Sequence, residues 1–459
     1  MGVNFCPQCL EKQRRIDRLE EEVRRLKQNL HYRERSAKEG PFGSSTPSAR
    51  RPFKANAAEE QRAQVGGARP GHKGHGRTRI EARQADHCQT VPVGATTCPT
   101  CAGPLQNRGC RSRSVLDAQP LRALRIVYQL QKKYCPHCRK FIRAQAPGVL
   151  RKSLFGNQLL TQVVFLHYFY GLPLGRVCQQ LGIGLGAAVA LLHRGASLFK
   201  GLVPTLLDEY RQAPVRHADE TGWRNDGRSG YAWLFATPVL SVFLFRRSRS
   251  ARVAREALGE APLVGVLVVD RYKAYNRAPC SLQYCYAHLL RDVEDLAKEF
   301  PDQAEVQAFT GALIPLLAEA MHLHSRPLSD QEYYAQARQL QQAIEKVVAS
   351  PAQHLGVRAM QELFRENAHR LYLWVEDRRV PAHNNYAERQ LRPTVIARKT
   401  SFGSQSDAGA ATREVLMTLV HTLALRFPDP QTHFKSVLDQ LAQDPTRDPL
   451  RLLFPQDSS

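Results

Sequence analysis

Apolar positions near the start of the chain follow a heptad period. In residues 11–35 they recur at alternating intervals of three and four, which places them on one face of a charged helix. Two heptads are short for an independent coiled coil, so the pattern predicts either half of a short dimeric zipper or a single amphipathic helix. The positions are Ile16, Leu19, Val23, Leu26 and Leu30.

Further along the chain, the apolar period becomes that of β-strands. Three short β-prone runs are followed by a helical stretch at 250–258 and a fourth run, an order that predicts an α/β sheet. Helical patterns flank this region on both sides. The runs stand at 215–218, 231–237, 240–246 and 263–269, and the flanking helical stretches at 154–212, 286–376 and 384–427.

These patterns divide a chain of 459 residues, which is too long for one hydrophobic core, into several segments. Residues 36–85 have almost no apolar period and many Gly, Pro, Ser and basic residues, which predicts a flexible linker. We predict a multidomain α+β protein. Its segments are 1–35, a CxxC pair and short coiled coil; 36–85, a flexible basic linker; 86–150, a zinc-binding module; 151–212, a helical region resembling a helix-turn-helix; 213–292, the first part of the α/β core; 293–376, a helical insertion; 377–427, the second part of the core; and 428–459, a C-terminal tail.

Residues 171–196 have the length and the central glycine turn of a helix-turn-helix. The second helix, at 186–194, is almost entirely apolar, so few of its side chains would reach base edges. The segment therefore predicts either a DNA-binding motif, with Arg176 and Arg194 on phosphates, or a packed pair of helices.

The net charge of +23 is unevenly distributed. Residues 1–150 hold 29 Lys and Arg against 12 Asp and Glu, which leaves +17 of the total in this region. Such a basic region indicates a polyanionic partner, most simply nucleic acid. In the linker, Lys73 and Arg77 belong to a basic run at 66–77, which is either an arm that follows DNA phosphates or a spacer whose charge aids solubility.

Signals for export and membrane insertion are weak in this sequence. The first residues lead into a charged segment and provide no apolar signal-peptide core. The longest uncharged stretch, 153–175, contains polar residues such as Asn157 and His167 and is typical of a buried helix and turn. We therefore expect no membrane attachment and a cytoplasmic location.

Eleven cysteines, an odd number without a secretory signal, argue against a disulfide framework. The pairs Cys98/Cys101 and Cys135/Cys138 are CxxC motifs, and two such turns complete a tetrahedral site with four thiolates. We predict a structural Zn²⁺ there. The alternative is two unrelated pairs of loop cysteines. Residues 114–134 between them are expected to form a hairpin.

Three acidic residues stand out by their context. Asp219 and Asp270 each end an apolar run, and Glu388 lies near the start of a polar helical stretch. A carboxylate at the end of a buried strand costs desolvation free energy unless a cation lies beside it. Two such Asp residues and a helical Glu are typical of a two-metal phosphoryl-transfer site. Any one of the Asp residues alone is more simply a turn or cap residue, but the strand order favours the metal site.

The chain resembles bacterial transposases of the insertion sequence 66 family. The resemblance rests on the short zipper, the basic run at 66–77, the two CxxC pairs, and distinctive blocks around the three carboxylates. The family commonly has Gly after the second Asp, where this chain has Arg271. The blocks are 217–223, 269–276 and 384–393, followed by 401–409 and the tail at 429–454.

This resemblance implies a ribonuclease-H-like catalytic core interrupted by an all-helical insertion. Asp219, Asp270 and Glu388 would be the DDE triad that holds two Mg²⁺ or Mn²⁺ ions. Cys285 and His288 match a CxxH element whose role is packing, metal binding or DNA contact. The expected phosphate contacts are Arg389, Arg392, Arg398 and Lys399, in addition to Lys73 and Arg77.

The function implied is a DNA transposase that binds terminal inverted repeats, cleaves the strand at the element end and transfers its 3′-hydroxyl to target DNA. Expected partners are DNA, further copies of the chain in a dimer or higher oligomer, and accessory proteins of the same element. The expected setting is the nucleoid in a bacterial cytoplasm. Two alternatives are another nuclease on the ribonuclease-H-like fold and a DNA-binding protein derived from an inactive transposase.

Overall fold

The computed structural model of the protein describes residues 121–137 and 139–455, together with residues 15, 19, 22, 83, 90–91, 97–104 and 106. The predicted DNA contacts Lys73 and Arg77 and the predicted zinc ligand Cys138 lie outside the described residues. Of the heptad segment, the three described residues are helical. The chain divides into two compact units, Pro52–Arg122 and the remainder.

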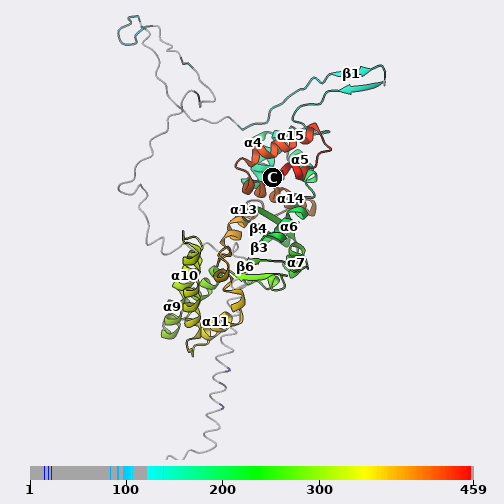
Figure 1. Cartoon of the computed structure of the whole chain (residues 1–459). Helices are drawn as coiled ribbons and strands as arrows, with labels where there is room; N and C mark the ends of the chain where they lie inside the picture. The colour runs from blue at the N-terminus through cyan, green and yellow to red at the C-terminus, as the bar shows by residue number, and fades with distance from the viewer. Residues whose placement is uncertain are drawn as a thin grey trace, which may run out of the picture. The chain divides into compact units, whose positions relative to one another are not determined.

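A mixed sheet of five strands, in the order β5-β4-β3-β6-β7, lies in the larger unit (Figure 1). β3, β4 and β5 pair antiparallel, whereas β6 and β7 continue the sheet in parallel from β3. The sequence predicted four of these strands and missed β7, which is only four residues long. Together with the surrounding helices, the sheet is consistent with a ribonuclease-H-like α/β core. The strands are β3 (Val215–Asn225), β4 (Arg228–Thr237), β5 (Leu240–Arg246), β6 (Val266–Val269) and β7 (Ser281–Tyr284).

The hairpin between β3 and β4 turns at Asp226 and Gly227, which have left-handed φ values of +53° and +68°. Two consecutive left-handed residues suit the two-residue turn that matches the twist of a hairpin, and Asp-Gly is a favoured pair for it. β3 consequently extends to Asn225, well beyond the predicted run at 215–218. Its buried polar residues had interrupted the apolar pattern.

Helix α14 (Asp407–Arg426) covers the outer edge of β5. Three backbone N–H groups of this edge strand donate to side chains of the helix at 3.0–3.2 Å. The acceptors are spaced four residues apart, so they line one face of the helix and satisfy an edge that would otherwise be open to pairing. The pairs are Ser241 with Thr422, Phe243 with Thr418, and Phe245 with Glu414.

Three further helices contact the sheet region. Helix α7 (Ala251–Leu258), as predicted, connects β5 to β6. Helix α6 (Leu202–Gln212) packs against β4 and β5. Helix α13 (Asn385–Ser401) packs against β3 and β4, and this contact brings a segment more than 160 residues away in sequence to the strand that carries Asp219.

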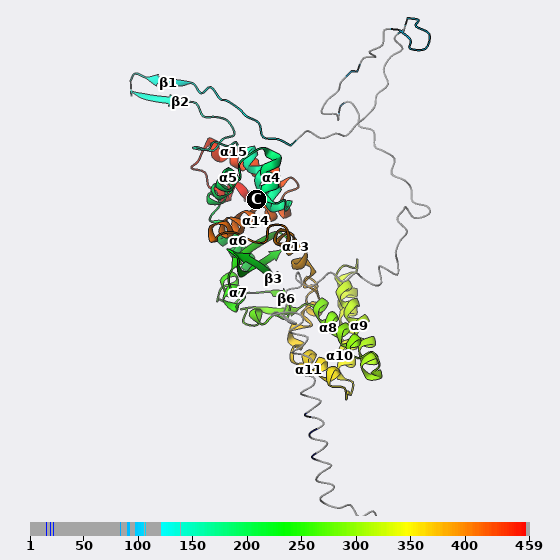
Figure 2. The same cartoon turned by 180° about the vertical axis from the view of Figure 1, so that it is seen from behind.

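A helical group that precedes the sheet in sequence packs with the C-terminal helices (Figure 2). The side-chain amide of Asn157 donates to Asp439 at 2.8 Å, and the rings of Phe165 and Phe199 both contact Phe434. Residues 428–459, expected as a tail, therefore include two helices that complete this group. The helices are α3 (Asn157–Val164), the π-helix η4 (Phe165–Phe169), α4 (Leu174–Leu181), α5 (Leu185–Leu198), α15 (Pro430–Gln443) and α16 (Pro449–Leu453).

The predicted helix-turn-helix segment forms α4 and α5, which are bent by 110° about a turn that begins at Gly182. Gly182 has a left-handed φ of +66°, which a glycine adopts without strain. The exposed start of α5 presents the apolar side chains of Leu185 and Val189. Arg194 donates instead to the backbone carbonyls of residues 151 and 152. These contacts favour the packed pair of helices.

The helical insertion follows β7 and returns to the sheet near it. The Gln283 amide donates to the Leu371 carbonyl at 3.2 Å and accepts from the Trp374 N–H at 3.3 Å. Of the single helices in the described part of the chain, α9 alone is long and apolar enough to cross a membrane, and it packs against α8 and α10. The elements are α8 (Tyr286–Glu299), α9 (Ala304–Leu323), α10 (Asp330–Ala349), α11 (Leu355–Glu366), η6 (Ala368–Arg370) and α12 (Leu373–Glu376).

The cysteine-rich segment contains one hairpin in the larger unit, formed by β1 (Lys132–Cys135) and β2 (Lys140–Arg143). The hairpin expected at 114–134 is thus shifted, because the described residues 121–131 belong to no strand. In the other unit, Cys98 and Cys101 lie in a tight turn closed by a bridge between Thr97 and Pro104.

Candidate active site

The structure brings two of the three predicted carboxylates to adjacent strands. The parallel pairing of β3 with β6 aligns His217 with Val268, so the same register two residues later aligns Asp219 with Asp270. Asp219 lies within β3 and Asp270 directly follows β6. Both side chains are buried, with 4% and 6% of the residue surface exposed.

Glu388 lies in the first turn of α13 and faces the same region. Asn384, which precedes this helix, donates its side-chain amide to the Ala218 carbonyl at 2.8 Å. Its side-chain oxygen accepts from His217 Nδ1 at 2.9 Å. Burial lowers the pKa of His217 to about 4, so the ring is neutral at physiological pH. These two bonds hold the start of α13 against the strand that carries Asp219.

The environment of the two Asp residues disfavours their charged forms. Burial, and then the charge of Glu220, raises the pKa of Asp270 to about 7. Burial also raises the pKa of Asp219 well above its ordinary value, and the neighbouring carboxylates, among them Asp270 and Glu388, add to this effect. The backbone N–H groups of residues 220 and 272 each donate to one of the Asp carboxylates at 2.9 Å.

Glu220 belongs to a separate set of contacts, as the alternation of side chains along a strand predicts. Its fully buried carboxylate accepts from Arg249 at 2.6 Å and from the Tyr275 hydroxyl. The Arg249 guanidinium also stacks on Tyr272, 3.8 Å from the ring centroid. Arg249 could not be predicted as part of the site, because a single Arg in a basic loop carries no signal for burial.

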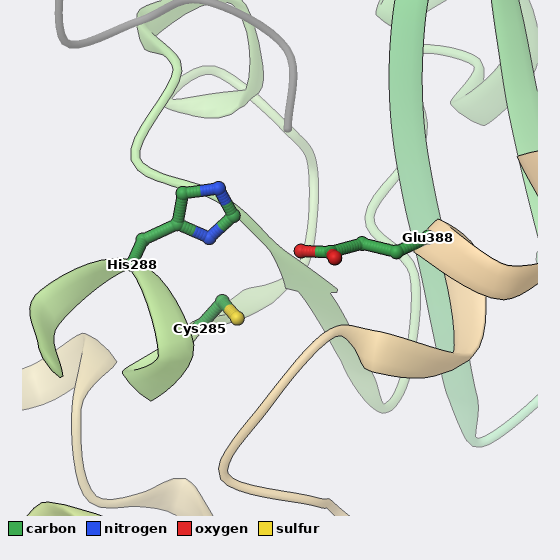
Figure 3. Close-up of side chains that lie close together, drawn as sticks. All are labelled: Cys285, His288 and Glu388. Atoms are coloured by element: carbon green, nitrogen blue, oxygen red, sulfur yellow. The ribbon is translucent and has the colours of Figure 1, made fainter. Parts of the chain in front are cut away.

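Glu388 also meets the CxxH element. Cys285 immediately precedes α8 and His288 lies in its first turn, and Figure 3 shows both side chains directed toward Glu388. One ligand atom from each of the three residues lies within 4.8 Å of the other two. The backbone N–H of Asn384 donates to Cys285 Sγ at 3.1 Å. Within the described part of the chain, this is the one group of three or more such residues at that spacing.

The oxygen atoms of Asp219, Asp270 and Glu388 are therefore not all within 4.8 Å of one another. Glu388 Oε1 is buried and has no hydrogen-bond partner among the described residues. Arg291 approaches Glu388 Oε2 at 4.0 Å, and Arg271, which directly follows Asp270, pairs with Asp292 of α8.

The basic residues predicted to contact phosphates lie on two sides of α13. Arg389, Arg392 and Lys399 are exposed at spacings of three and seven residues, which places them on one face of the helix. Ile396 lies between them and Phe402 follows, 54% and 75% exposed, so this surface alternates basic and apolar side chains. Arg398 instead points to the sheet, where it donates to the Thr221 hydroxyl and the Gly222 carbonyl.

The four predicted zinc ligands are not all described. In the turn at Cys98, backbone N–H groups at Thr100 and then Cys101 lower the pKa of the Cys98 thiol, which favours a thiolate. Cys135 ends β1, and Cys138 lies outside the described residues. The four-cysteine site remains a prediction.

Comparison with known proteins gives a match to the IS66 transposase family over residues 152–412. This range runs from the helices before the sheet to the start of α14 and includes all three carboxylates. The chain is also similar to the uncharacterized proteins y4jD and y4qI of Sinorhizobium fredii (strain NBRC 101917 / NGR234). It is 26% identical to y4jD over 396 residues, which cover 76% of this chain and 75% of the relative. It is 26% identical to y4qI over 374 residues, which cover 72% and 67%. Because the family match spans more than half of the sequence, the chain belongs to the IS66 family and contains its DDE transposase domain.

Proposed function

We propose that the protein cleaves DNA at the ends of an insertion sequence and joins the freed 3′-hydroxyl to target DNA. Asp219, Asp270 and Glu388 are the proposed metal ligands. The observation that carries the proposal is the alignment of Asp219, within β3, with Asp270, directly after β6, together with the electrostatic effect of Glu388 on Asp219. The family implies a transposase, and its members generally use divalent metal ions.

The residues fit divalent cations. Asp219 and Asp270 are buried with raised pKa values, and Glu388 has a buried oxygen without a hydrogen-bond partner among the described residues. A bound cation would offset the cost of burying these charges and would give that oxygen a partner. Two ions about 4 Å apart are the arrangement typical of sites that transfer phosphoryl groups through such carboxylates. Bound there, such ions would stabilise the attacking and leaving oxygens of an in-line displacement.

The chain's own residues position these ligands. Asn384 and His217 hold α13 to β3, and the backbone N–H groups at 220 and 272 orient the two Asp carboxylates. The guanidinium of Arg249 offsets the charge of Glu220. Glu220, although it is next to Asp219 in sequence, therefore stands outside the proposed ligand set.

We further propose that DNA follows the exposed face of α13. Arg389, Arg392 and Lys399 would contact phosphates, and Ile396 and Phe402 would contact sugar or base surfaces. Phe402 follows Glu388 by a helical rise of about 21 Å at 1.5 Å per residue, or about six stacked base steps of 3.4 Å. Charge complementarity along the helix supports this path.

The basic N-terminal region is proposed to bind the terminal inverted repeats. Lys73 and Arg77 would follow phosphates, and a Zn²⁺ held by Cys98, Cys101, Cys135 and Cys138 would stabilise the module. The heptad helix would help to pair two chains, and thus two DNA ends. Accessory proteins of the same element and a location on bacterial chromosomal DNA belong to the same proposal.

A labelled duplex that carries the terminal repeat tests the proposed function. With Mg²⁺, the wild-type protein should nick the element end and then join it to unlabelled target DNA. Asp219→Ala, Asp270→Ala and Glu388→Ala should abolish both products but retain binding of the duplex. Asp302→Ala, at an exposed acidic residue of the insertion, should behave like the wild type.

The joined product separates this function from its main alternative. A nuclease on the same fold would yield nicked ends and no strand-transfer product. Binding without either product would indicate a DNA-binding protein derived from an inactive transposase. Retained cleavage by any one of the three Ala variants would remove that residue from the proposed ligand set.

A further inference from the structure

We propose that Cys285, His288 and Glu388 form a second metal subsite, selective for a soft divalent ion of the Zn²⁺ class, beside the proposed Mg²⁺ site. The inference rests on the proposed function in one respect, because Glu388 would belong to both subsites. It assigns a binding role to the CxxH element, which the sequence left open among packing, metal binding and DNA contact.

The three donors surround one position. Sγ, an imidazole nitrogen and a carboxylate oxygen lie within 4.8 Å of one another, and Figure 3 shows the side chains approaching from three sides. Cys285 and His288 share one side of α8 because they are three residues apart at its start. Glu388 faces them from α13, whose start is held to β3 through Asn384.

Burial and then the charge of Glu388 raise the pKa of the Cys285 thiol, so a thiolate there would need a bound cation; backbone donors lie beside the sulfur. The backbone N–H of Asn384 donates to Cys285 Sγ at 3.1 Å, and N–H groups at Ala287 and His288 also point to this sulfur. A buried thiol that only packs needs no such donors, whereas a thiolate ligand is commonly supported by them. Asn384 therefore joins both subsites, since its side chain holds the strand of Asp219 and its backbone holds Cys285.

The chemical types of the three donors determine which ion this subsite would prefer. Zn²⁺ binds thiolate, imidazole and carboxylate in tetrahedral geometry, and three protein ligands leave one position open. Mg²⁺ prefers oxygen ligands in octahedral geometry and is a poor match for Cys285 and His288. Glu388 would therefore take part in two subsites with different donors. Asp219 and Asp270 offer oxygen atoms to one subsite. Cys285 and His288 offer a sulfur and a nitrogen to the other.

Sharing of Glu388 has a functional consequence. Zn²⁺ at the soft subsite would engage a carboxylate that the Mg²⁺ site also requires. Micromolar zinc should therefore inhibit Mg²⁺-dependent cleavage, and additional Mg²⁺ should relieve the inhibition.

The test measures zinc bound by the full-length protein after equilibrium dialysis against buffered Zn²⁺. The wild type should bind about one more zinc per chain than Cys285→Ser and His288→Gln, with affinity for this ion lowered at least about tenfold in either variant. Cys178→Ser, at a buried cysteine of α4 outside the cluster, serves as the matched control. Zinc in the N-terminal cysteine module would be common to all of these proteins and cancels in the comparison.

Co²⁺ provides a second readout. A thiolate-to-cobalt charge-transfer band should be weaker in Cys285→Ser than in Cys178→Ser, and circular dichroism verifies that both variants are folded. Equal zinc content and equal cobalt spectra in the wild type and the two cluster variants would overturn the proposal. If Cys285→Ser does not fold, His288→Gln alone decides it by the same comparison.

The outcome is separable from that of the proposed function. Asp219→Asn should lose cleavage yet keep the additional zinc. Persistent cleavage by Asp219→Asn would refute the catalytic assignment, whereas only the zinc and cobalt comparison bears on the soft subsite.

Discussion

Replacement of Asp270 by Asn should stabilise the cation-free protein, although it removes a proposed catalytic ligand. The pKa of Asp270 lies near 7 in the folded protein, against an ordinary value of 3.8. At 1.36 kcal/mol per pH unit, the difference corresponds to about 4 kcal/mol. The Asn side chain has nearly the same shape, and its oxygen can still accept from the Tyr272 N–H. It avoids the cost of burying a charge.

The effect has a defined pH dependence. Since the folded pKa is higher than the unfolded one, the folded state binds the proton more tightly, and stability falls as the pH rises through the range from 4 to 7. The free energy of unfolding of Asp270→Asn should therefore exceed that of the wild type by about 4 kcal/mol at pH 8 and by less than about 2 kcal/mol at pH 5. Mg²⁺ should narrow the gap at pH 8, because it stabilises only the wild type.

Urea denaturation at pH 5 and pH 8, in buffer freed of divalent cations and then with Mg²⁺, measures these differences. Asp302→Asn, at an exposed acidic residue, is the control and should change stability little at either pH. The reasoning would be refuted if Asp270→Asn were less stable than the wild type at pH 8. It would also be refuted if the stability difference between the two proteins were the same at pH 5 and pH 8.

Three other predictions concern Arg249, Phe402 and the exposed face of α13. Arg249→Met should lower the free energy of unfolding, measured in urea, by about 3–5 kcal/mol, because it leaves the buried Glu220 carboxylate without its cation. Arg451→Met, at an exposed ion pair, is the control and should lower it by less than about 1 kcal/mol. Equal effects of the two substitutions would contradict the burial argument. Phe402→Gly should raise the free energy of unfolding by roughly 0.5–1 kcal/mol, because relief of a left-handed φ of +59° outweighs the added conformational entropy that glycine gives the unfolded chain. A variant less stable than the wild type would indicate that the Phe402 ring packs against the protein. Joint replacement of Arg389, Arg392 and Lys399 by Ala should reduce the slope of log affinity for DNA against log salt by about 2.7, and an unchanged slope would exclude this face from phosphate contact.

Residue chemistry next to apolar runs was enough to select Asp219, Asp270 and Glu388 as candidates, and the family resemblance reinforced the choice. The strand register then aligns the first two, which a single apolar run cannot establish. The helix between β5 and β6 was also predictable, because its apolar and polar positions have a clear helical period.

Features that depend on distant partners were not predictable. β7 has four residues and acquires its identity only by pairing with β6. Nothing in the sequence distinguishes Arg249 and Arg398 from a surface Arg. In the structure, however, Arg249 is buried against Glu220, and Arg398 donates hydrogen bonds to the sheet. The packing of the C-terminal helices against the first helical group was not predicted, because the residues in contact are far apart in sequence. Asn157 of α3 and Asp439 of α15, for example, are 282 positions apart.

The central claim is that Asp219, Asp270 and Glu388 hold the cations used in DNA strand cleavage. A change of metal preference tests it most directly, since a thiolate ligand disfavours Mg²⁺ and accepts the softer Mn²⁺ more readily. Cleavage of a labelled inverted-repeat end by wild type and Asp270→Cys should be compared in each metal. The account predicts that wild type cleaves with Mg²⁺ and that the Cys variant cleaves only with Mn²⁺. Equal cleavage by the Cys variant in Mg²⁺ and Mn²⁺ would contradict it.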